Sequence, residues 1–92
     1  MAKSSTWYMY VLHCADKSYY CGVTTDIHRR VDEHNRTKKG AKYTRPRRPV
    51  ALFYKEEHPD QSTAQQSEAT FKKLNQKQKL DYMFEQTVKR HE

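Results

Sequence analysis

The sequence lacks any long apolar run, and its start is no exception. No stretch of its 92 residues approaches the roughly 20 apolar residues that a membrane-spanning helix needs. Residues 1–6 have no apolar core of the kind that secretory signal peptides carry. We therefore expect a flexible tail over residues 1–6, no membrane association through a span, and a cytoplasmic protein.

Cysteine is scarce as well. Cys14 and Cys21 are the only two cysteines, which does not make a disulfide framework. His13 lies beside Cys14, but the chain has no CxxC motif and no second ligand cluster. Structural zinc takes four close ligands, so these residues do not predict a zinc site.

Apolar residues make up only 35% of the chain, so its single domain must have a small core. Seven tyrosines, three phenylalanines and one tryptophan supply much of the apolar surface. Acidic residues are outnumbered by basic ones, and the net charge is +7. Such a charge suits a nucleic acid or an anionic membrane surface as partner.

Aromatic and β-branched residues predict a hairpin at the start of the domain. Residues 7–14 and 19–23 have the composition of strands, and residues 15–18 supply a turn. Gly22 lies inside the second strand, which indicates either a bulge or a close approach of the backbone to a neighbour.

A helix, a loop and a third strand should follow. Ile27 and Val31 lie one helical turn apart and predict a helix over residues 27–36, capped by Thr24, Thr25 or Asp26. Residues 36–48 have no helical period and form a loop. A strand is expected over residues 50–54, after which His58-Pro59-Asp60 breaks the chain.

Two further helices are predicted after this break. Ser62 and Gln65 form a capping-box pattern ahead of the apolar residues Ala64, Phe71 and Leu74. Asn75 can cap the last helix, whose buried side is expected to carry Leu80, Met83, Phe84, Thr87 and Val88. The order ββαβαα predicts a small α/β (α+β) domain over residues 7–89, with a three-stranded sheet flanked by helices.

The loop between the first helix and the third strand is strongly basic, and no acidic residue occurs from Asn35 to Lys55. Its candidate nucleic-acid contacts are Lys38, Lys39, Lys42, Tyr43, Arg45, Arg47 and Arg48. Cations that bind phosphate, interleaved with an aromatic side chain that can stack on a base, are typical of nucleic-acid surfaces. A solvated loop is the alternative.

Arg30 and His34 are spaced i and i+4, so a helix would present both on one side, at the border of core and solvent. Arginine there can grip a phosphate and histidine can relay a proton. The alternative is an ordinary charged surface helix.

Glu68 precedes Phe71 by about one turn and can point toward the sheet. One glutamate with phosphate oxygens and waters makes a usual magnesium site. Pairing with Lys72 is the alternative. Tyr10 and Tyr20 in the strands could serve as proton acceptors only if nearby cations lowered their pKa, and packing is their ordinary role.

In this combination the chain resembles the GIY-YIG endonuclease superfamily, in particular its small stand-alone bacterial members. The matching segments are residues 8–12, 20–24, 26–35, 40–50 and the Glu68 to Leu74 helix. The resemblance implies a three-stranded sheet flanked by helices and a hydrolytic mechanism with one divalent metal, Mg²⁺ or Mn²⁺. It implies catalytic roles for Tyr10, Tyr20, Arg30 and His34, and makes Glu68 the metal ligand.

The sequence departs from the family pattern at some positions. Tyr8 and Met9 replace the glycine and isoleucine of the first motif, and Cys21 replaces the isoleucine of the second. Asn75 is the nearest candidate for the asparagine of larger relatives.

The resemblance implies a structure-selective DNA endonuclease linked to repair or recombination and acting as a monomer, with RNA left open as a substrate. Two other functions remain open: a basic nucleic-acid-binding module with little nuclease activity, and an interaction with an acidic protein or ribosomal RNA.

Overall fold

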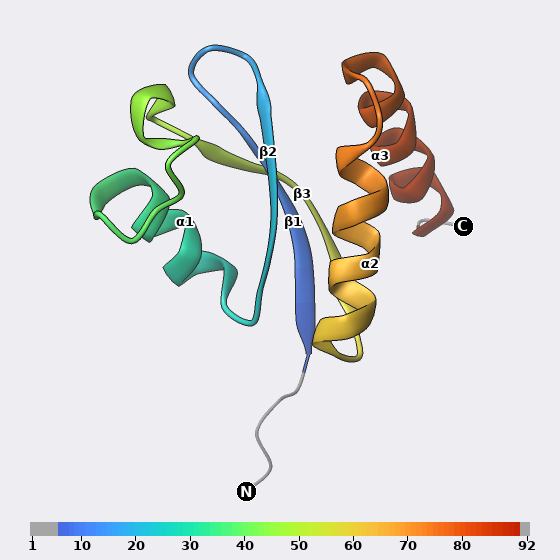
Figure 1. Cartoon of the computed structure of the whole chain (residues 1–92). Coiled ribbons are helices and arrows are strands. Elements are labelled where there is room, and N and C mark those ends of the chain that lie inside the picture. Colours follow the sequence, from blue (N-terminus) through green and yellow to red (C-terminus); the bar gives the residue numbers. More distant parts are fainter. Residues whose placement is uncertain (1–5, 91–92) are drawn as a thin grey trace, which may run out of the picture.

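The computed structural model describes residues 6–90 and has the expected architecture, a three-stranded sheet with three helices in the order ββαβαα (Figure 1). The elements are β1 (Trp7–His13), β2 (Tyr19–Thr24), α1 (Ile27–Arg36), a 3-10 turn at Arg45–Arg47, β3 (Ala51–His58), α2 (Gln61–Lys72) and α3 (Gln76–Arg90). The tail expected over residues 1–6 lies, apart from Thr6, outside the described residues. Within residues 6–90, no helix has the length and apolar character needed to cross a membrane.

Strand β1 forms the middle of the sheet and pairs antiparallel with β2 and β3. The β1–β2 register is regular and sets Tyr10 opposite Gly22. Among the described strands, the register shift falls between β1 and β3, at Val11/Leu12. Gly22 therefore marks a close backbone approach and not a bulge.

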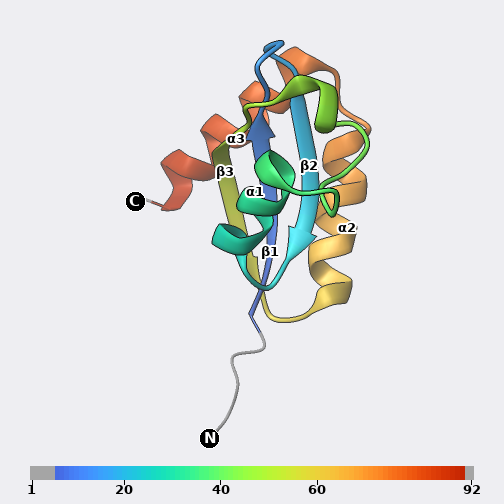
Figure 2. The same ribbon diagram turned by 90° about the vertical axis from the view of Figure 1, so that its left-hand side faces the viewer.

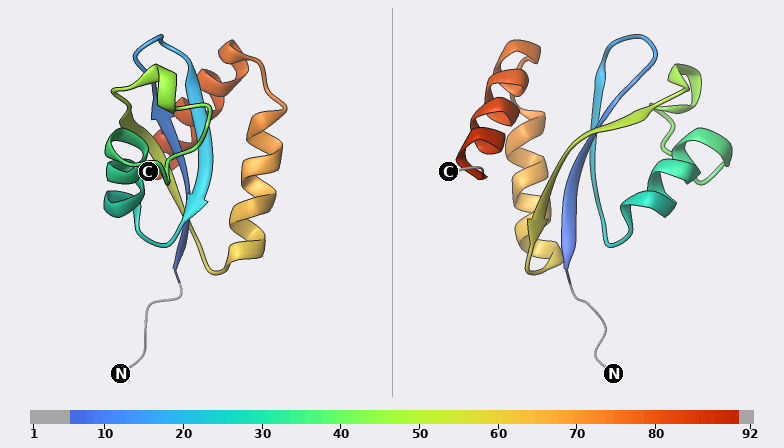
Figure 3. Two further views of the ribbon diagram at one scale, coloured as in Figure 1. Left: turned by 60° about the vertical axis from the view of Figure 1, so that its left-hand side comes forward. Right: turned by 180° about the vertical axis from the view of Figure 1, so that it is seen from behind.

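The helices cover the two faces of the sheet unequally. Helix α1 lies on one face, while α2 and α3 lie on the other (Figures 1 and 3). Side chains alternate along β1, so Met9 and Val11 belong to the core under α2, and Tyr10 and Leu12 belong to the core under α1. This alternation decides which residues of the hairpin can reach each helix.

Side-chain caps fix where the helices begin. The Asp26 carboxylate accepts a hydrogen bond from the backbone N–H of Arg29, as expected for α1. Helix α2 is capped by Asp60, which accepts from the N–H of Thr63 at 2.8 Å, so the prediction of a cap at Ser62 was wrong. Asp60 is extended and its carboxylate already fills the capping role.

The third helix has the expected cap but not the expected buried side. Asn75 accepts from the N–H of Gln78 at 2.8 Å, and the Gln78 side chain accepts from the N–H of Asn75 at 2.9 Å. These two reciprocal hydrogen bonds engage the Asn75 side chain at the start of α3.

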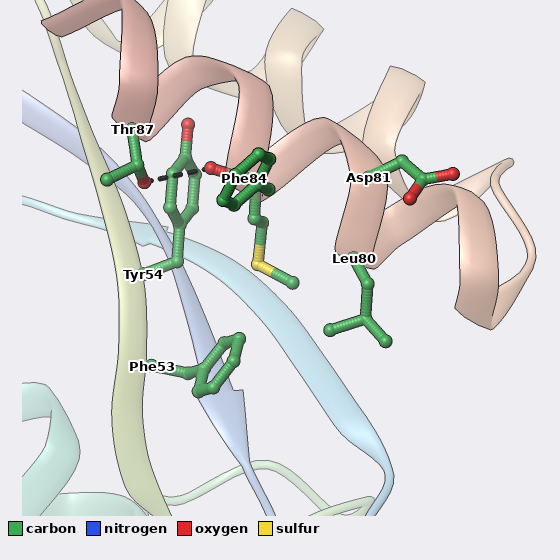
Figure 4. A pocket seen from close by; sticks show the side chains of 7 residues that line it. Phe53, Tyr54, Leu80, Asp81, Phe84 and Thr87 are labelled. Carbon is green, nitrogen blue, oxygen red and sulfur yellow. Dashed lines mark hydrogen bonds between the residues drawn. The ribbon is translucent and has the colours of Figure 1, made fainter.

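Of the residues expected on the buried side of α3, only Met83 is buried. Leu80, Phe84 and Val88 are 40%, 70% and 39% exposed, and Thr87 is exposed too. The helix packs on the sheet through Tyr82 and Met83 at the margin of the core. Its apolar stripe instead lines an open hollow of about 460 Å³ beside Phe53 and Tyr54 (Figure 4).

Strand β3 continues to His58, beyond the predicted end at residue 54. Glu56 explains the extension, because its buried carboxylate faces α2 and α3. Its Oε2 accepts hydrogen bonds from Tyr54 and Tyr82, and its Oε1 accepts one from Ser67 and lies 3.0 Å from His58 Nε2. Charged residues hid this strand from the sequence pattern.

Candidate active site

Tyr10 occupies the centre of the face that α1 covers, and only 1% of its surface is exposed. It reaches this position because Gly22 lies opposite it on β2. A Cβ at position 22 would come within 2.6 Å of the Tyr10 hydroxyl oxygen and 2.8 Å of its Cζ. Glycine at this position is therefore what lets the phenol lie flat against β2.

His34 contacts Tyr10 from α1 and is fully buried, not at the border of core and solvent. Its Nε2 lies 2.9 Å from the Tyr10 hydroxyl oxygen. Nδ1 lies 3.0 Å from the Thr44 hydroxyl oxygen, and the backbone N–H of Ala41 approaches it at 3.3 Å. The Tyr10 hydroxyl and the His34 ring thus share one hydrogen bond.

Arg30 lies on the same side of α1, and 26% of its side chain is exposed. One of its terminal nitrogens donates to the Glu33 carboxylate at 2.8 Å and to the Lys39 carbonyl at 2.9 Å. The guanidinium also interacts with the Tyr10 hydroxyl. Since arginine carries five N–H groups in a planar fork, donors remain for a phosphate.

Tyr20 completes this cluster from β2. Its ring centroid lies 5.2 Å from that of His34, edge to face, and 5.9 Å from that of Tyr43, stacked. Tyr20 is half-buried, whereas Tyr10 behind it is buried. The structure thus brings together the four residues that the sequence suggested as catalytic, Tyr10, Tyr20, Arg30 and His34.

Burial shapes the electrostatics of the cluster. It raises the pKa of the Tyr10 phenol well above its ordinary value, and the Arg30 guanidinium opposes this increase. Burial, with Arg30 and Arg48 nearby, lowers the pKa of His34 to about 4. At neutral pH both rings are therefore uncharged, and Arg30 carries the positive charge of the site.

The basic loop divides into two groups. Lys38, Lys39, Lys42 and Arg45 are exposed, and the segment that carries them runs beside α1 (Figure 2). Arg48 instead donates to the carbonyls of His34 and Thr37 at the end of α1. That helix end carries partial negative charge, which a guanidinium stabilises.

Arg47 is also engaged within the protein. Its Nε donates to the Asp16 carboxylate at 2.8 Å, and its Cζ lies 3.9 Å from the centroid of the Tyr43 ring. Asp16, Arg47, Tyr43 and Tyr20 thus form a chain of contacts that ends at His34. One face of Tyr43 is covered, and this aromatic side chain positions Tyr20.

Glu68 lies apart from this cluster, on α2 and therefore beyond the sheet from Tyr10. Its carboxylate pairs with Lys72 at 2.9 Å, and 20% of its side chain is exposed. After burial, the Glu68 charge is the strongest influence raising the pKa of Cys21 on β2, to about 12. Glu68 and Tyr10 can therefore share a substrate only around the free edge of β2.

The residues present fit a magnesium ion held by a single carboxylate. Within residues 6–90, no group of three histidine, cysteine or acidic side chains could enclose a metal. Magnesium commonly takes one or two carboxylates and completes its shell with water and substrate phosphate. Glu68 is partly exposed, and its carboxylate offers hard oxygen ligands of the kind that bind Mg²⁺ or Mn²⁺.

Three residues that organise the site were not found from the sequence. Thr44 is fully buried, lies 3.0 Å from His34 Nδ1 and donates to the Ala41 carbonyl. Asn35 exchanges two hydrogen bonds with the backbone of Val50, which ties α1 to the start of β3. Gly40 lies against the backbone of His34, and a Cβ at position 40 would be 2.7 Å from the Cα of His34. No pattern in the sequence signals these contacts.

Comparison with known proteins agrees with the geometry. Residues 6–81 match the family described as the GIY-YIG catalytic domain. The chain is 57% identical over 74 residues to a UPF0213 protein of Bacillus cereus, covering 80% of this chain and 76% of that protein. It is 52% identical to a UPF0213 protein of Streptococcus sanguinis, covering 87% and 91% of the two chains.

Two solved structures share the fold. A solution NMR structure of a protein from E. faecalis is 44% identical, with a TM-score of 0.67 and coverage of 96% of this chain and 93% of that one. The solution NMR structure of a UPF0213 protein from Bacillus halodurans is 39% identical, with a TM-score of 0.54 and coverage of 84% and 81%.

Proposed function

Because this chain belongs to the GIY-YIG catalytic domain family, we propose that it is an endonuclease that hydrolyses DNA phosphodiester bonds with Mg²⁺ or Mn²⁺. We further propose that it selects its substrate by DNA structure, in repair or recombination, and that it acts as a cytoplasmic monomer. The net charge of +7 supports a polyanionic substrate.

One observation carries this proposal. Arg30 and His34 contact the Tyr10 hydroxyl from α1, Tyr20 packs on His34 from β2, and the adjoining loop carries four exposed cations. An ordinary charged surface helix gives no reason for a buried histidine hydrogen-bonded to a buried phenol. A site that handles a proton next to a phosphate does.

The residues have separable roles in this mechanism. Arg30 has free donors and would stabilise the charge that builds on the phosphate. His34 shares a hydrogen bond with the Tyr10 hydroxyl, and Arg30 would stabilise the negative charge that develops on the Tyr10 oxygen. Tyr10 would accept the proton of the attacking water while its own hydroxyl proton passes to Nε2 of His34. Tyr20, held by Tyr43, separates this pair from solvent at the edge of β2.

Glu68 is proposed to hold the divalent metal. When bound, such an ion supplies positive charge that offsets charge on the leaving oxygen. The exposed side chains of Lys38, Lys39, Lys42 and Arg45 would hold the backbone of the DNA without reading its sequence.

A cleavage screen tests this function. Single-stranded, nicked and branched DNA, and a matched RNA, are incubated with the protein in Mg²⁺ or Mn²⁺. We expect metal-dependent cleavage of at least one DNA substrate, and its loss in Glu68→Ala with the fold retained. A product from RNA alone would overturn the choice of DNA.

A nucleic-acid-binding module is the second candidate, and two features favour it. Burial keeps Tyr10 protonated, and the Glu68 carboxylate is already paired with Lys72. Binding that weakens steeply with salt, without any metal-dependent product, would select this alternative.

A further inference from the structure

A second hollow, of about 320 Å³, opens at the free edge of β2. This size lies at the lower end of the roughly 300–1,000 Å³ typical of small-molecule pockets. Its wall is made by residues of β2, of the basic loop and of both helices α2 and α3: Tyr19, Tyr20, Cys21, Tyr43, Lys72 and Lys79. It therefore bridges the two faces of the sheet, with the Tyr10 cluster on one side and Glu68 on the other.

The lining combines two chemistries. Tyr20 and Tyr43 stack on each other with an angle of 28° between their planes, and they present aromatic surface. Lys72 and Lys79 bring ammonium groups from two different helices. Aromatic surface binds bases whatever their identity, and ammonium groups bind phosphates.

The hollow is also adjacent to the proposed chemistry. Tyr20 lines it and also touches His34, the hydrogen-bond partner of Tyr10. Lys72 lines it and also pairs with Glu68. A ligand in this hollow would contact side chains that border both halves of the divided site.

We propose that this hollow binds one nucleotide of the substrate strand, next to the phosphate that is cut. The base lies against the tyrosines, and its phosphate is bound by Lys72 and Lys79. This inference rests on the proposed function and explains how a strand passes the edge of β2 from Arg30 toward Glu68. It adds Lys72 and Lys79 to the nucleic-acid interface. With the basic loop alone, the interface would lie only on the α1 side of the sheet.

Lys79 is the better residue to test. It has no ion pair within residues 6–90, and its Nζ lies 5.6 Å from the centroid of the Phe71 ring. Lys77 offers a matched control on the same helix. Its side chain is 85% exposed, pairs with Asp81 and does not line the hollow.

The experiment measures binding in EDTA, where metal-dependent cleavage cannot interfere. A fluorescein-labelled single-stranded 12-mer is titrated with the full-length protein, and anisotropy is followed at several salt concentrations. Lys79→Gln should weaken binding about five- to ten-fold and reduce the salt slope by about 0.7, the value of one phosphate contact on a single strand. Lys79→Arg, which keeps the charge, should bind within two-fold of the unmodified protein.

Lys77→Gln should also bind within two-fold of the unmodified protein. Equal losses in Lys77→Gln and Lys79→Gln would show a general charge effect and overturn the assignment of the hollow, as would unchanged binding by Lys79→Gln. Either result can coexist with cleavage by the unmodified protein, in which case the proposed function stands without this pocket. No binding and no cleavage by the unmodified protein would overturn both.

Discussion

Gly22 and the Tyr10 hydroxyl are packed so closely that no side chain fits between them: a Cβ at position 22 would lie 2.6 Å from the oxygen. The register places the two residues opposite each other on adjacent strands. The backbone of β2 thus forms one wall of the Tyr10 site, and His34 contacts the hydroxyl from α1.

Gly22→Ala should therefore displace Tyr10. We expect a loss of about 1–3 kcal/mol in the free energy of unfolding, typical of overpacking in a core, and a loss of cleavage activity. Urea unfolding and the cleavage assay measure the two effects. The double variant Tyr10→Phe/Gly22→Ala removes the closest clashing atom and should recover part of the stability. No recovery would show that the hydroxyl is not the source of the strain.

His34 should make the protein lose stability in mild acid. Its pKa is lowered to about 4 in the folded state, chiefly by burial, against roughly 6.5 in the unfolded chain. Below pH 6.5 the unfolded state therefore binds more protons than the folded state. The contribution of neutral His34 to the free energy of unfolding is complete above that pH and is lost as the pH falls toward 4.

Between pH 7.5 and 5 the loss of unfolding free energy due to His34 amounts to about 2 kcal/mol. Urea unfolding of the natural protein and of His34→Gln across this range measures it. The natural protein should lose the stability, while His34→Gln should start lower and change less. Parallel curves for the two proteins would mean that His34 does not titrate in this way.

The Glu68–Lys72 pair should compete with metal binding, because the ammonium occupies the carboxylate that would hold the ion. Lys72→Gln should strengthen Mn²⁺ binding about two- to five-fold, as the loss of a partly exposed ion pair suggests. Direct Mn²⁺ titration followed by electron paramagnetic resonance checks this. Lys73→Gln, one residue along, controls for general charge and should have a smaller effect. Weaker Mn²⁺ binding by Lys72→Gln would contradict the competition.

Glu56 should matter for stability. Its buried carboxylate accepts hydrogen bonds from Tyr54, Ser67 and Tyr82, and these bonds outweigh burial and lower its pKa. Glu56→Gln should cost about 2–4 kcal/mol, since it removes charge-assisted hydrogen bonds and inserts a donor among donors. Thermal unfolding at pH 7 measures this loss. Glu57→Gln, the exposed neighbour on β3, should stay within about 0.5 kcal/mol of the natural protein.

Local patterns in the sequence predicted most of the fold. The hairpin, the α1 boundaries and the Asp26 and Asn75 caps depend on neighbouring residues and were confirmed. The cap at Asp60 was missed because Ser62 offered a competing pattern. The end of β3 was missed because Glu56 is buried by partners distant in the sequence, Ser67 and Tyr82.

The candidate site was less accessible to sequence reasoning. Spacing could pair Arg30 with His34 on one helix, but it could not show that His34 is buried or that its Nδ1 contacts Thr44 and Ala41. Nor could it separate Arg48, which binds the end of α1, from the exposed cations of the same loop. Helix periodicity likewise placed Phe84 in the core, because it does not report how far α3 extends past the sheet.

Single-turnover cleavage at saturating protein tests whether Arg30 acts on the phosphate during hydrolysis. Glu33→Gln serves as the control, because it removes the partner of Arg30 but keeps the guanidinium. We expect Arg30→Ala to lower the rate of the bound complex about 100- to 1,000-fold, with binding in EDTA reduced only a few-fold and Glu33→Gln retaining most of the rate. A rate in Arg30→Ala within a few-fold of the natural protein would contradict the account.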